Sequence, residues 1–511
     1  MTTPPTDRAR QPVRRVVIAG GGTAGWMTAA CLSNTLGKGL DIRLVESDEI
    51  GTVGVGEATI PTMLTFNKLA GIDEPKFMAA TQAVFKLGIK FEGWRDIGDD
   101  YIHSFGTTGQ DHWTAGFQHF WLKGRDRKLA RRYGDYCPEL RAAEQDKFAH
   151  LPGGRLNYAF HLDATLYARY LRTLSEARGV RRIEGKIAEV TRHPDGDLAA
   201  LRLADGSVIE GDLFVDCTGM RGLLIGDTLG VKLEDWSQWL PCDRAIALQT
   251  QSVAPPIPYV RAIAHPFGWQ WQIPLQHRVG NGIVFSSRHV SDDEALSTLL
   301  GNIQGEVLTK PRVIPFKPCQ RERVWARNCV AIGLSSGFLE PLESTSIHLI
   351  QRGVIRLLQC FPNNGLRQVD IDEYNRQTRD EMAHIRDFII LHYKVTNRSD
   401  SAFWNQVRTM EVPASLQHRI DLFRESGRVF RLDSELFAEN SWIQVMLGQG
   451  ITPSQHHAIA DLMDDRELNG FLEEIRGQVE RTVAQLPAHA DYIAHYCKAA
   501  APPVKAMPAA A

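Results

Sequence analysis

The hydrophobic pattern of the chain predicts alternating strands and helices from about residue 13 to residue 230. Short β-branched runs at residues 14–20, 41–47 and 211–219 are typical of strands, and residues 163–177 repeat with a helical period. A second strand-rich section covers residues 245–287, and long helical patterns follow Ser344. The pattern predicts an α/β fold with additional β-sheet and a helical C-terminal part.

The segment VFKLGIKFEGW, residues 84–94, alternates with a period of two. Its odd positions from Phe85 to Phe91 are apolar, whereas Lys86 and Lys90 fall on the opposite face. The simplest interpretation is an amphipathic strand whose lysines face water. The alternative is a buried functional amine, and the choice depends on the rest of the chain.

Bulk composition excludes several classes of protein. A chain of 511 residues with 43% apolar residues is long enough for more than one subdomain. Its 58 Lys and Arg nearly balance 60 Asp and Glu, so we expect neither a nucleic-acid nor a membrane partner. The eight cysteines lack paired spacing, which predicts no metal site, reduced thiols and a cytoplasmic protein.

A glycine-rich turn predicts a dinucleotide site. VVIAGGGTAGWM is a buried-type strand, a turn and a helix start, and the next strand ends at Glu46, where an acid can accept ribose hydroxyl bonds. The alternative is a tight structural turn. The residues expected around the pyrophosphate are Gly20, Gly22, Thr23, Ala24 and Gly25.

Three later segments favour FAD over a compact nicotinamide site. GTVGVGEATIP follows Glu46 closely, and two further strands end in glycine near Gly219 and Gly333. Strand ends so far apart in the sequence suit a two-nucleotide ligand stretched across a sheet, which makes a nicotinamide-only dehydrogenase less consistent with the pattern.

Five motifs together resemble one known family. GGGTAGW, GVGEATIP, FKLGIKF, GWQWQIP and FLEPLEST are similar to those of the flavin-dependent halogenases, particularly the branch of the tryptophan halogenases. The resemblance implies a Rossmann-type FAD core, reduced FAD made by a separate flavin reductase, O2, chloride or bromide, and a small aromatic substrate. Relatives are often dimeric, and the sequence does not choose between monomer and homodimer. The further FAD contacts it implies are Gly56, Glu57, Ala58, Ile187, Leu334 and Ile347.

The same resemblance assigns catalytic roles. The first lysine of FKLGIKF, Lys86, would lie in a tunnel between flavin and substrate, with Glu343 across from it. The halide would bind the backbone amides of Thr345 and Ser346, although the family usually has glycine at the second position. Taken alone, Glu343 to Thr345 predicts only a helix start capped by a Ser or Thr side chain. Trp269 and Trp271 would shield the flavin from the substrate, and a purely structural interpretation makes them an aromatic core.

The resemblance also implies a substrate pocket with His103, Phe105 and Trp442, and the alternative for the first two is a buried histidine beside a core phenylalanine. Tryptophan halogenases contact the amino acid end of their substrate through a tyrosine pair, whereas this chain has Trp442 and Ile443. We therefore expect an indole or a similar electron-rich ring rather than free tryptophan.

The implied mechanism makes hypohalous acid from halide, O2 and reduced FAD. Lys86 would hold that acid by a hydrogen bond or become a haloamine, and Glu343 would stabilise the ring cation and accept its proton. The alternatives are a flavin-dependent aromatic monooxygenase and a non-catalytic FAD-binding protein. We expect an FAD core over residues 13–398 with an embedded substrate segment at about 80–160, a helical cap over 399–498, and flexible tails at 1–12 and 499–511.

Overall fold

The computed structural model describes residues 12–50, 56–152 and 156–500. Most of the expected tails, and Gly51 to Val55 of the second glycine-rich segment, lie outside this part of the chain. The first residues of the second tail are held in place, because Ala499 donates its N–H to Gln276 and Ala500 accepts a bond from Gln82.

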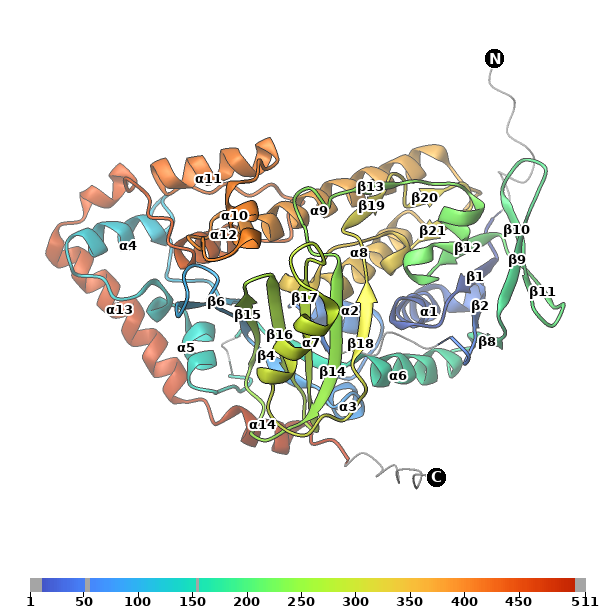
Figure 1. The fold of residues 1–511 in the computed structure, drawn as a ribbon, viewed down its shortest axis with the longest axis horizontal. Coiled ribbons are helices and arrows are strands. Elements are labelled where there is room, and N and C mark those ends of the chain that lie inside the picture. Colours follow the sequence, from blue (N-terminus) through green and yellow to red (C-terminus); the bar gives the residue numbers. More distant parts are fainter. Residues whose placement is uncertain (1–11, 51–55, 153–155, 501–511) are drawn as a thin grey trace, which may run out of the picture.

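A six-stranded sheet lies at the right of Figure 1. Its strands are parallel except for the edge strand β20, and their order is β20 (Trp325–Ala326), β21 (Cys329–Ala331), β12 (Leu213–Asp216), β1 (Arg15–Ala19), β2 (Asp41–Glu46) and β8 (Arg181–Glu184). Val16 and Ile18 face one apolar cluster while Val17 and Ala19 face another, so both faces are buried. The continuous apolar strands of the first half therefore form a covered parallel sheet, as the α/β pattern predicts.

Helices cover the first of these faces. α1 packs against α6 and α8, and α2 contacts both α1 and α8. Their bounds are α1 (Thr23–Leu36), α2 (Thr62–Leu69), α6 (Ala164–Glu176) and α8 (Ser346–Gln359). A small sheet of β9 (Ile187–Arg192), β10 (Leu198–Leu203) and β11 (Val208–Glu210) lies at the right-hand edge of the molecule beside β8 in Figure 1.

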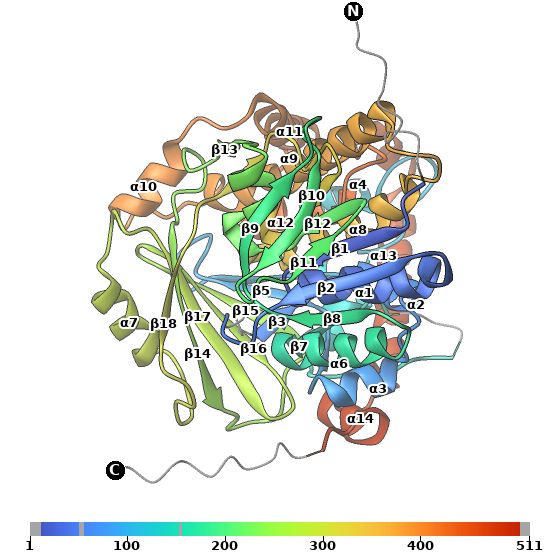
Figure 2. The same cartoon turned by 90° about the vertical axis from the view of Figure 1, so that its right-hand side faces the viewer.

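A seven-stranded sheet forms the second layer and lies beside the first sheet in Figure 2. Its order is β18 (Arg312–Pro315), β14 (Arg244–Gln251), β17 (Arg278–Phe285), β16 (Gly268–Pro274), β15 (Tyr259–His265), β5 (Gly88–Glu92) and β6 (Asp100–Ser104). This is the predicted strand-rich section, extended by β5 and β6 from residues 88–104 and by β18 from residues 312–315.

Residues 84–92 form two strands in two different sheets rather than one continuous strand. β4 (Val84–Lys86) pairs with β7 (Ala159–Asp163), which also pairs with β3 (Gly56–Ala58), and β5 joins the seven-stranded sheet. The chain changes sheets at Leu87, whose N–H bonds to Pro258 and whose carbonyl accepts from Phe105. Both faces of β4 are buried, so the prediction of a single amphipathic strand is wrong here.

The C-terminal helices cover the remaining core. The buried residues of α9 and α12 pack with Phe91, Trp269 and Trp271 of the seven-stranded sheet. α13 instead packs against α4 and α5, so this helical side of the molecule also includes residues 117–144. The remaining helices are α3 (Glu74–Ala80), α4 (Phe117–Asp126), α5 (Pro138–Glu144), α7 (Asp292–Gly301), α9 (Gln368–Lys394), α10 (Ala402–Thr409), α11 (Ala414–Ser426), α12 (Glu439–Gly448), α13 (Asp465–Ala484) and α14 (His489–Tyr496).

Two other features complete the fold. β13 (Leu233–Asp235), β19 (Cys319–Arg321) and β22 (Gly337–Phe338) form a small antiparallel sheet that leads into the FLEPLEST segment. Among the described residues, none of the helices combines the length and the apolar character that crossing a bilayer requires.

Candidate active site

Lys86 ends β4 with its side chain wholly inside the protein. Its Nζ donates to the carbonyl oxygen of Thr59 at 3.0 Å and to Ser344 Oγ at 2.9 Å, and it lies 5.1 Å from the centre of the Phe105 ring. Burial lowers the pKa of Lys86 to about 7, although the nearby Glu343 charge opposes this shift. The expectation of a buried amine is confirmed, and the interpretation of Lys86 as a solvated cation is wrong.

Lys90 has the ordinary environment of a surface lysine. Its side chain is 27% exposed and pairs with Asp100 at 2.6 Å. Lys86 is therefore buried and Lys90 is partly exposed, which agrees with the interpretation of Lys86 as a buried amine.

Glu343 lies in the same buried site, at the end of a short 3-10 turn, Pro341–Glu343. His103 Nδ1 lies 3.0 and 3.1 Å from its two carboxylate oxygens, and His392 Nε2 lies 2.8 Å from Oε1. Burial favours the neutral acid, but the interactions with His103 and then His392 outweigh it and hold the pKa of Glu343 at about 2. The carboxylate is therefore ionised at neutral pH.

His392 did not emerge from the sequence analysis. It follows Ile385 and Ile389 at helical spacing on the buried face of α9. A titratable residue in a row of apolar residues on one helix face was the sequence feature that could have identified His392 as a candidate site residue.

The start of α8 differs from the expected capped helix. Ser344 has φ 58° and ψ 36°, a left-handed conformation that is strained for a serine, and its hydroxyl accepts from Lys86. Thr345 occupies the N-cap position without a side-chain cap, so the predicted Ser or Thr cap is wrong. In the part of the chain described, the amides of Thr345 and Ser346 have no backbone or side-chain acceptor, which leaves them available to an anion.

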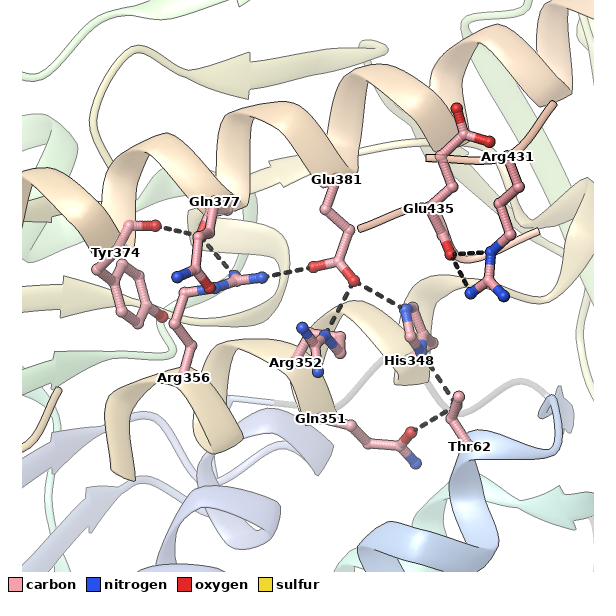
Figure 3. A network of polar contacts seen from close by, with 11 residues as sticks. Thr62, His348, Gln351, Arg352, Arg356, Tyr374, Gln377, Glu381, Arg431 and Glu435 are labelled. Atoms are coloured by element: carbon pink, nitrogen blue, oxygen red, sulfur yellow. Dashed lines mark hydrogen bonds and ion pairs between the residues drawn. The ribbon is translucent and has the colours of Figure 1, made fainter. Parts of the chain in front are cut away.

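A polar network fixes α8 against its neighbours (Figure 3). The buried Glu381 of α9 receives Arg356 Nη2 at 2.8 Å, Arg352 Nε at 3.0 Å and His348 Nε2 at 3.3 Å. Thr62 of α2 contacts the other nitrogen of His348 at 3.0 Å. These contacts connect α2, α8 and α9, beginning at His348 in the first turn of α8, and none of these residues was predicted.

The glycine turn has the shape of a phosphate cradle. A Cβ on Gly20 would lie 2.3 Å from the Cys217 carbonyl oxygen, and one on Gly25 would lie 1.9 Å from the Gly20 oxygen. A Cβ on Gly22 would meet no atom within 4 Å, and Gly22 precedes α1 without a side-chain cap. The turn thus needs two glycines for its own packing and leaves open space at the third, which fits a pyrophosphate at the helix start.

The other expected FAD residues lie on several different elements. Glu46 ends β2, is bonded by Arg182, and accepts from Trp26 Nε1 at 3.3 Å. The turns that follow β12 and β21 pack against each other, as the three glycine-ended strands predict. The remaining positions are Thr23 and Ala24 at the start of α1, Gly56, Glu57 and Ala58 in β3, Ile187 at the start of β9, Leu334 after β21 and Ile347 in the first turn of α8. Their contacts with FAD stay predictions.

Trp269 and Trp271 are buried on β16. Trp269 Nε1 donates to Glu340 Oε1 at 3.1 Å, and the Tyr393 hydroxyl donates to the same oxygen. Burial raises the pKa of Glu340 to about 7. The core interpretation of the two tryptophans is confirmed, and shielding of the flavin stays a prediction that needs the same bulk.

The expected substrate residues meet additional aromatic rings. The His103 ring lies 5.6 Å from Phe388 and 6.3 Å from Phe437, and Trp442 lies 4.8 Å from Phe388. Phe388 and Phe437 were not predicted. Ile443 is buried and offers no hydroxyl, so Trp442 and Ile443 do not reproduce a tyrosine pair.

Comparison with known proteins agrees with this geometry. The sequence model of the tryptophan halogenases matches residues 15–465. This chain belongs to the tryptophan halogenase family. A tryptophan 7-halogenase from Lentzea aerocolonigenes is 36% identical over 436 residues, covering 81% of this chain and 82% of that protein.

Solved structures of similar proteins extend the match to the whole fold. A flavin-dependent halogenase from Xanthomonas campestris has a TM-score of 0.95 and 64% identity, covering 96% of this chain and 100% of that one. A flavin-dependent halogenase from a Brevundimonas species has a TM-score of 0.91 and 46% identity, covering 95% and 99% of the two chains. The family membership supports the halogenase interpretation over an aromatic monooxygenase and a non-catalytic FAD-binding protein.

Proposed function

We propose that this halogenase passes electrophilic chlorine or bromine to an electron-rich aromatic ring through Lys86. This proposal depends on the surroundings of Lys86 Nζ, which is buried and donates to two neutral oxygens, the Thr59 carbonyl and the Ser344 hydroxyl. Ser344 directly follows the ionised Glu343 in the chain. A lysine in this environment exchanges its proton near neutral pH and offers a lone pair that surface lysines lack.

The cofactor would be FAD, delivered in its reduced form by a separate flavin reductase, and the oxidant O2. When bound, FAD supplies the chemistry that turns oxygen and halide into hypohalous acid. Gly20, Gly22 and Gly25 would hold its pyrophosphate, and the amides of Thr345 and Ser346 would hold the halide. The buried indole of Trp269 would keep the aromatic substrate away from the cofactor. Eight unpaired cysteines support a cytoplasmic location.

Glu343 would stabilise the positive charge that develops on the ring and accept the ring proton. Its low pKa does not prevent this step, because a ring carbon that has gained halogen is a far stronger acid than any carboxyl group. His103, Phe105 and Trp442 would orient the ring. Because Trp442 and Ile443 lack hydroxyl groups to hold an amino acid end, the preferred substrate would be an indole-like ring rather than free tryptophan.

The test supplies purified protein with a flavin reductase, NADH, FAD, bromide and indole, and detects products by mass spectrometry. Brominated indole is expected from the wild type and from Lys90→Ala, whereas Lys86→Ala should lose it and still oxidise reduced flavin. Brominated product at the wild-type rate from Lys86→Ala would refute the role of Lys86. Oxygenated product without bromine would support a monooxygenase instead. A marked preference for tryptophan over indole would overturn the substrate proposal.

A further inference from the structure

Phe388 of α9 lies at the centre of a cluster of aromatic rings. The Phe437 ring stacks on it with the ring centres 3.8 Å apart, and the Trp442 ring meets it edge to face at 4.8 Å. We call these three rings the aromatic wall. The wall adjoins the catalytic residues, because the His103 ring lies 5.6 Å from Phe388 and its Nδ1 lies 3.0 Å from Glu343.

Arg419 of α11 holds two members of this wall. Its guanidinium lies 4.2 Å from the centre of the Trp442 ring, which is the geometry of a cation–π contact. Nη1 and Nη2 of the same guanidinium donate to the two carboxylate oxygens of Glu435 at 2.9 and 2.6 Å. Because Glu435 lies two residues before Phe437, Arg419 restrains both Trp442 and the segment that carries Phe437.

The segment between α11 and α12 is also fastened through its backbone. Arg431 Nε and Nη2 donate to the backbone carbonyl oxygen of Glu435 at 3.1 and 2.7 Å (Figure 3). Arg419 Nη2 donates to the carbonyl oxygen of Phe430 at 3.3 Å. The side chain of Glu435 is only 2% exposed, so its charge depends on Arg419 for compensation.

This ion pair leaves no charge for a ligand at the wall. Both carboxylate oxygens of Glu435 accept from Arg419, so a carboxylate on a substrate would have to displace Glu435 to reach the guanidinium. Trp442 Nε1, by contrast, is buried and has no hydrogen-bond partner among the described residues. The wall therefore offers aromatic contact and one neutral donor.

We propose that Arg419 is a positioning residue that sets the aromatic wall, and that its pairing with Glu435 makes the pocket prefer an uncharged ring over one that carries a carboxylate. This inference rests on the proposed function, because it requires an aromatic substrate beside the wall. Arg419 acts through Trp442 and Phe437, so its loss should weaken substrate binding more than it slows halogen transfer at Lys86.

The positioning role is tested with Arg419→Met, which keeps an unbranched side chain beside Trp442 and removes the cation and its donors. With flavin reductase and bromide, KM for indole should rise about tenfold while kcat changes by less than about threefold. The double variant Arg419→Met/Glu435→Gln removes the buried unpaired carboxylate as well. It should show the same raised KM, and it keeps the measurement possible if the single variant does not fold.

The charge role is tested with Glu435→Gln, which leaves the cation of Arg419 without its counter-charge beside a ring that contacts Phe388. The ratio of kcat/KM for indoleacetate to kcat/KM for indole should rise about tenfold. One added charge about 12 Å from the substrate carboxylate has this effect at an effective dielectric constant of about 20.

A matched control is available elsewhere in the core. Arg398 donates to both carboxylate oxygens of Asp400 at 2.8 Å and lies 4.7 Å from the centre of the Trp404 ring. Trp404 packs against Trp94 and Phe403 rather than against the aromatic wall. Asp400→Asn should therefore keep the wild-type ratio for the two substrates.

Equilibrium dialysis of indole and indoleacetate gives a second readout that needs no turnover. The relative affinity for indoleacetate should rise in Glu435→Gln and stay unchanged in Asp400→Asn. An unchanged preference in Glu435→Gln, or an unchanged KM in the variants that carry Arg419→Met, would overturn the proposal. Binding of indole by the wild type without any brominated product would instead refute the proposed function, and the dialysis would still decide the role of the ion pair.

Discussion

Replacing Lys86 with methionine keeps an unbranched side chain of similar length and removes a charge from the interior. The pKa of this lysine falls from its ordinary 10.5 to about 7 because the side chain is buried. A fall of about 3.5 units corresponds to about 5 kcal/mol of folding free energy, the cost of taking the ammonium out of water.

Loss of the amine also has a cost. The carbonyl oxygen of Thr59 and the hydroxyl of Ser344 lose their donor, and this loss should lower the folding stability by about 1–3 kcal/mol. Lys86→Met should therefore be more stable than the wild type by about 2–4 kcal/mol at pH ~7 while losing halogenation. A lysine whose folded pKa is lowered weakens the fold most below the folded pKa, and the penalty disappears as pH rises toward the unfolded pKa. Because a neutral amine still donates to Thr59 and Ser344, the cost of losing it does not change with pH, and the variant should be less stable than the wild type by about 0–2 kcal/mol near pH ~10.

Urea unfolding of both proteins between pH ~6 and pH ~10 tests this expectation. Lys90→Met serves as the control, because Lys90 is partly exposed and paired with Asp100, and its difference from the wild type should stay small throughout. A methionine variant that is less stable than the wild type at neutral pH would contradict the burial argument. A stabilisation that does not change with pH would contradict the titration of Lys86.

Three further predictions follow from the site. Gly25→Ala should destabilise the protein because its Cβ would overlap a backbone oxygen, whereas Gly22→Ala should fold normally and bind flavin more weakly, which thermal unfolding and flavin titration distinguish. Glu340→Gln keeps the acceptor for Trp269 and removes a carboxyl whose pKa is raised from 4.5 to about 7. Because the wild type loses stability as pH rises across that interval, urea unfolding should show the variant more stable by about 3 kcal/mol at pH ~8 and equally stable below pH ~4. A difference that does not change with pH would contradict the raised pKa of Glu340. Glu381→Gln leaves three basic groups without their shared carboxylate and should lower the unfolding free energy by about 3–5 kcal/mol; a loss below about 1 kcal/mol would show that the network is not structural.

Local signals in the sequence determined much of the fold. The glycine turn was predictable because the close approaches at Gly20 and Gly25 depend on residues within a few positions or on the adjacent strand. The α/β alternation, the strand-rich section and the C-terminal helices follow from hydrophobic period, which reports the faces that avoid water. Lys86 and Glu343 were found by resemblance to a family, because neither residue differs in sequence pattern from an ordinary strand lysine or helix-start acid.

Only the tertiary structure decided the environment of these residues. The run of residues 84–92 has one continuous period, yet it divides at Leu87 because each half pairs with a different sheet. Lys86 is buried by partners far from it in the chain, and Glu343 receives its second histidine, His392, from a helix that by pattern alone is simply amphipathic. A period of apolar residues states which side of an element is buried, but the polar groups that meet there come from distant segments. Their protonation depends on the distances and desolvation that those segments create together.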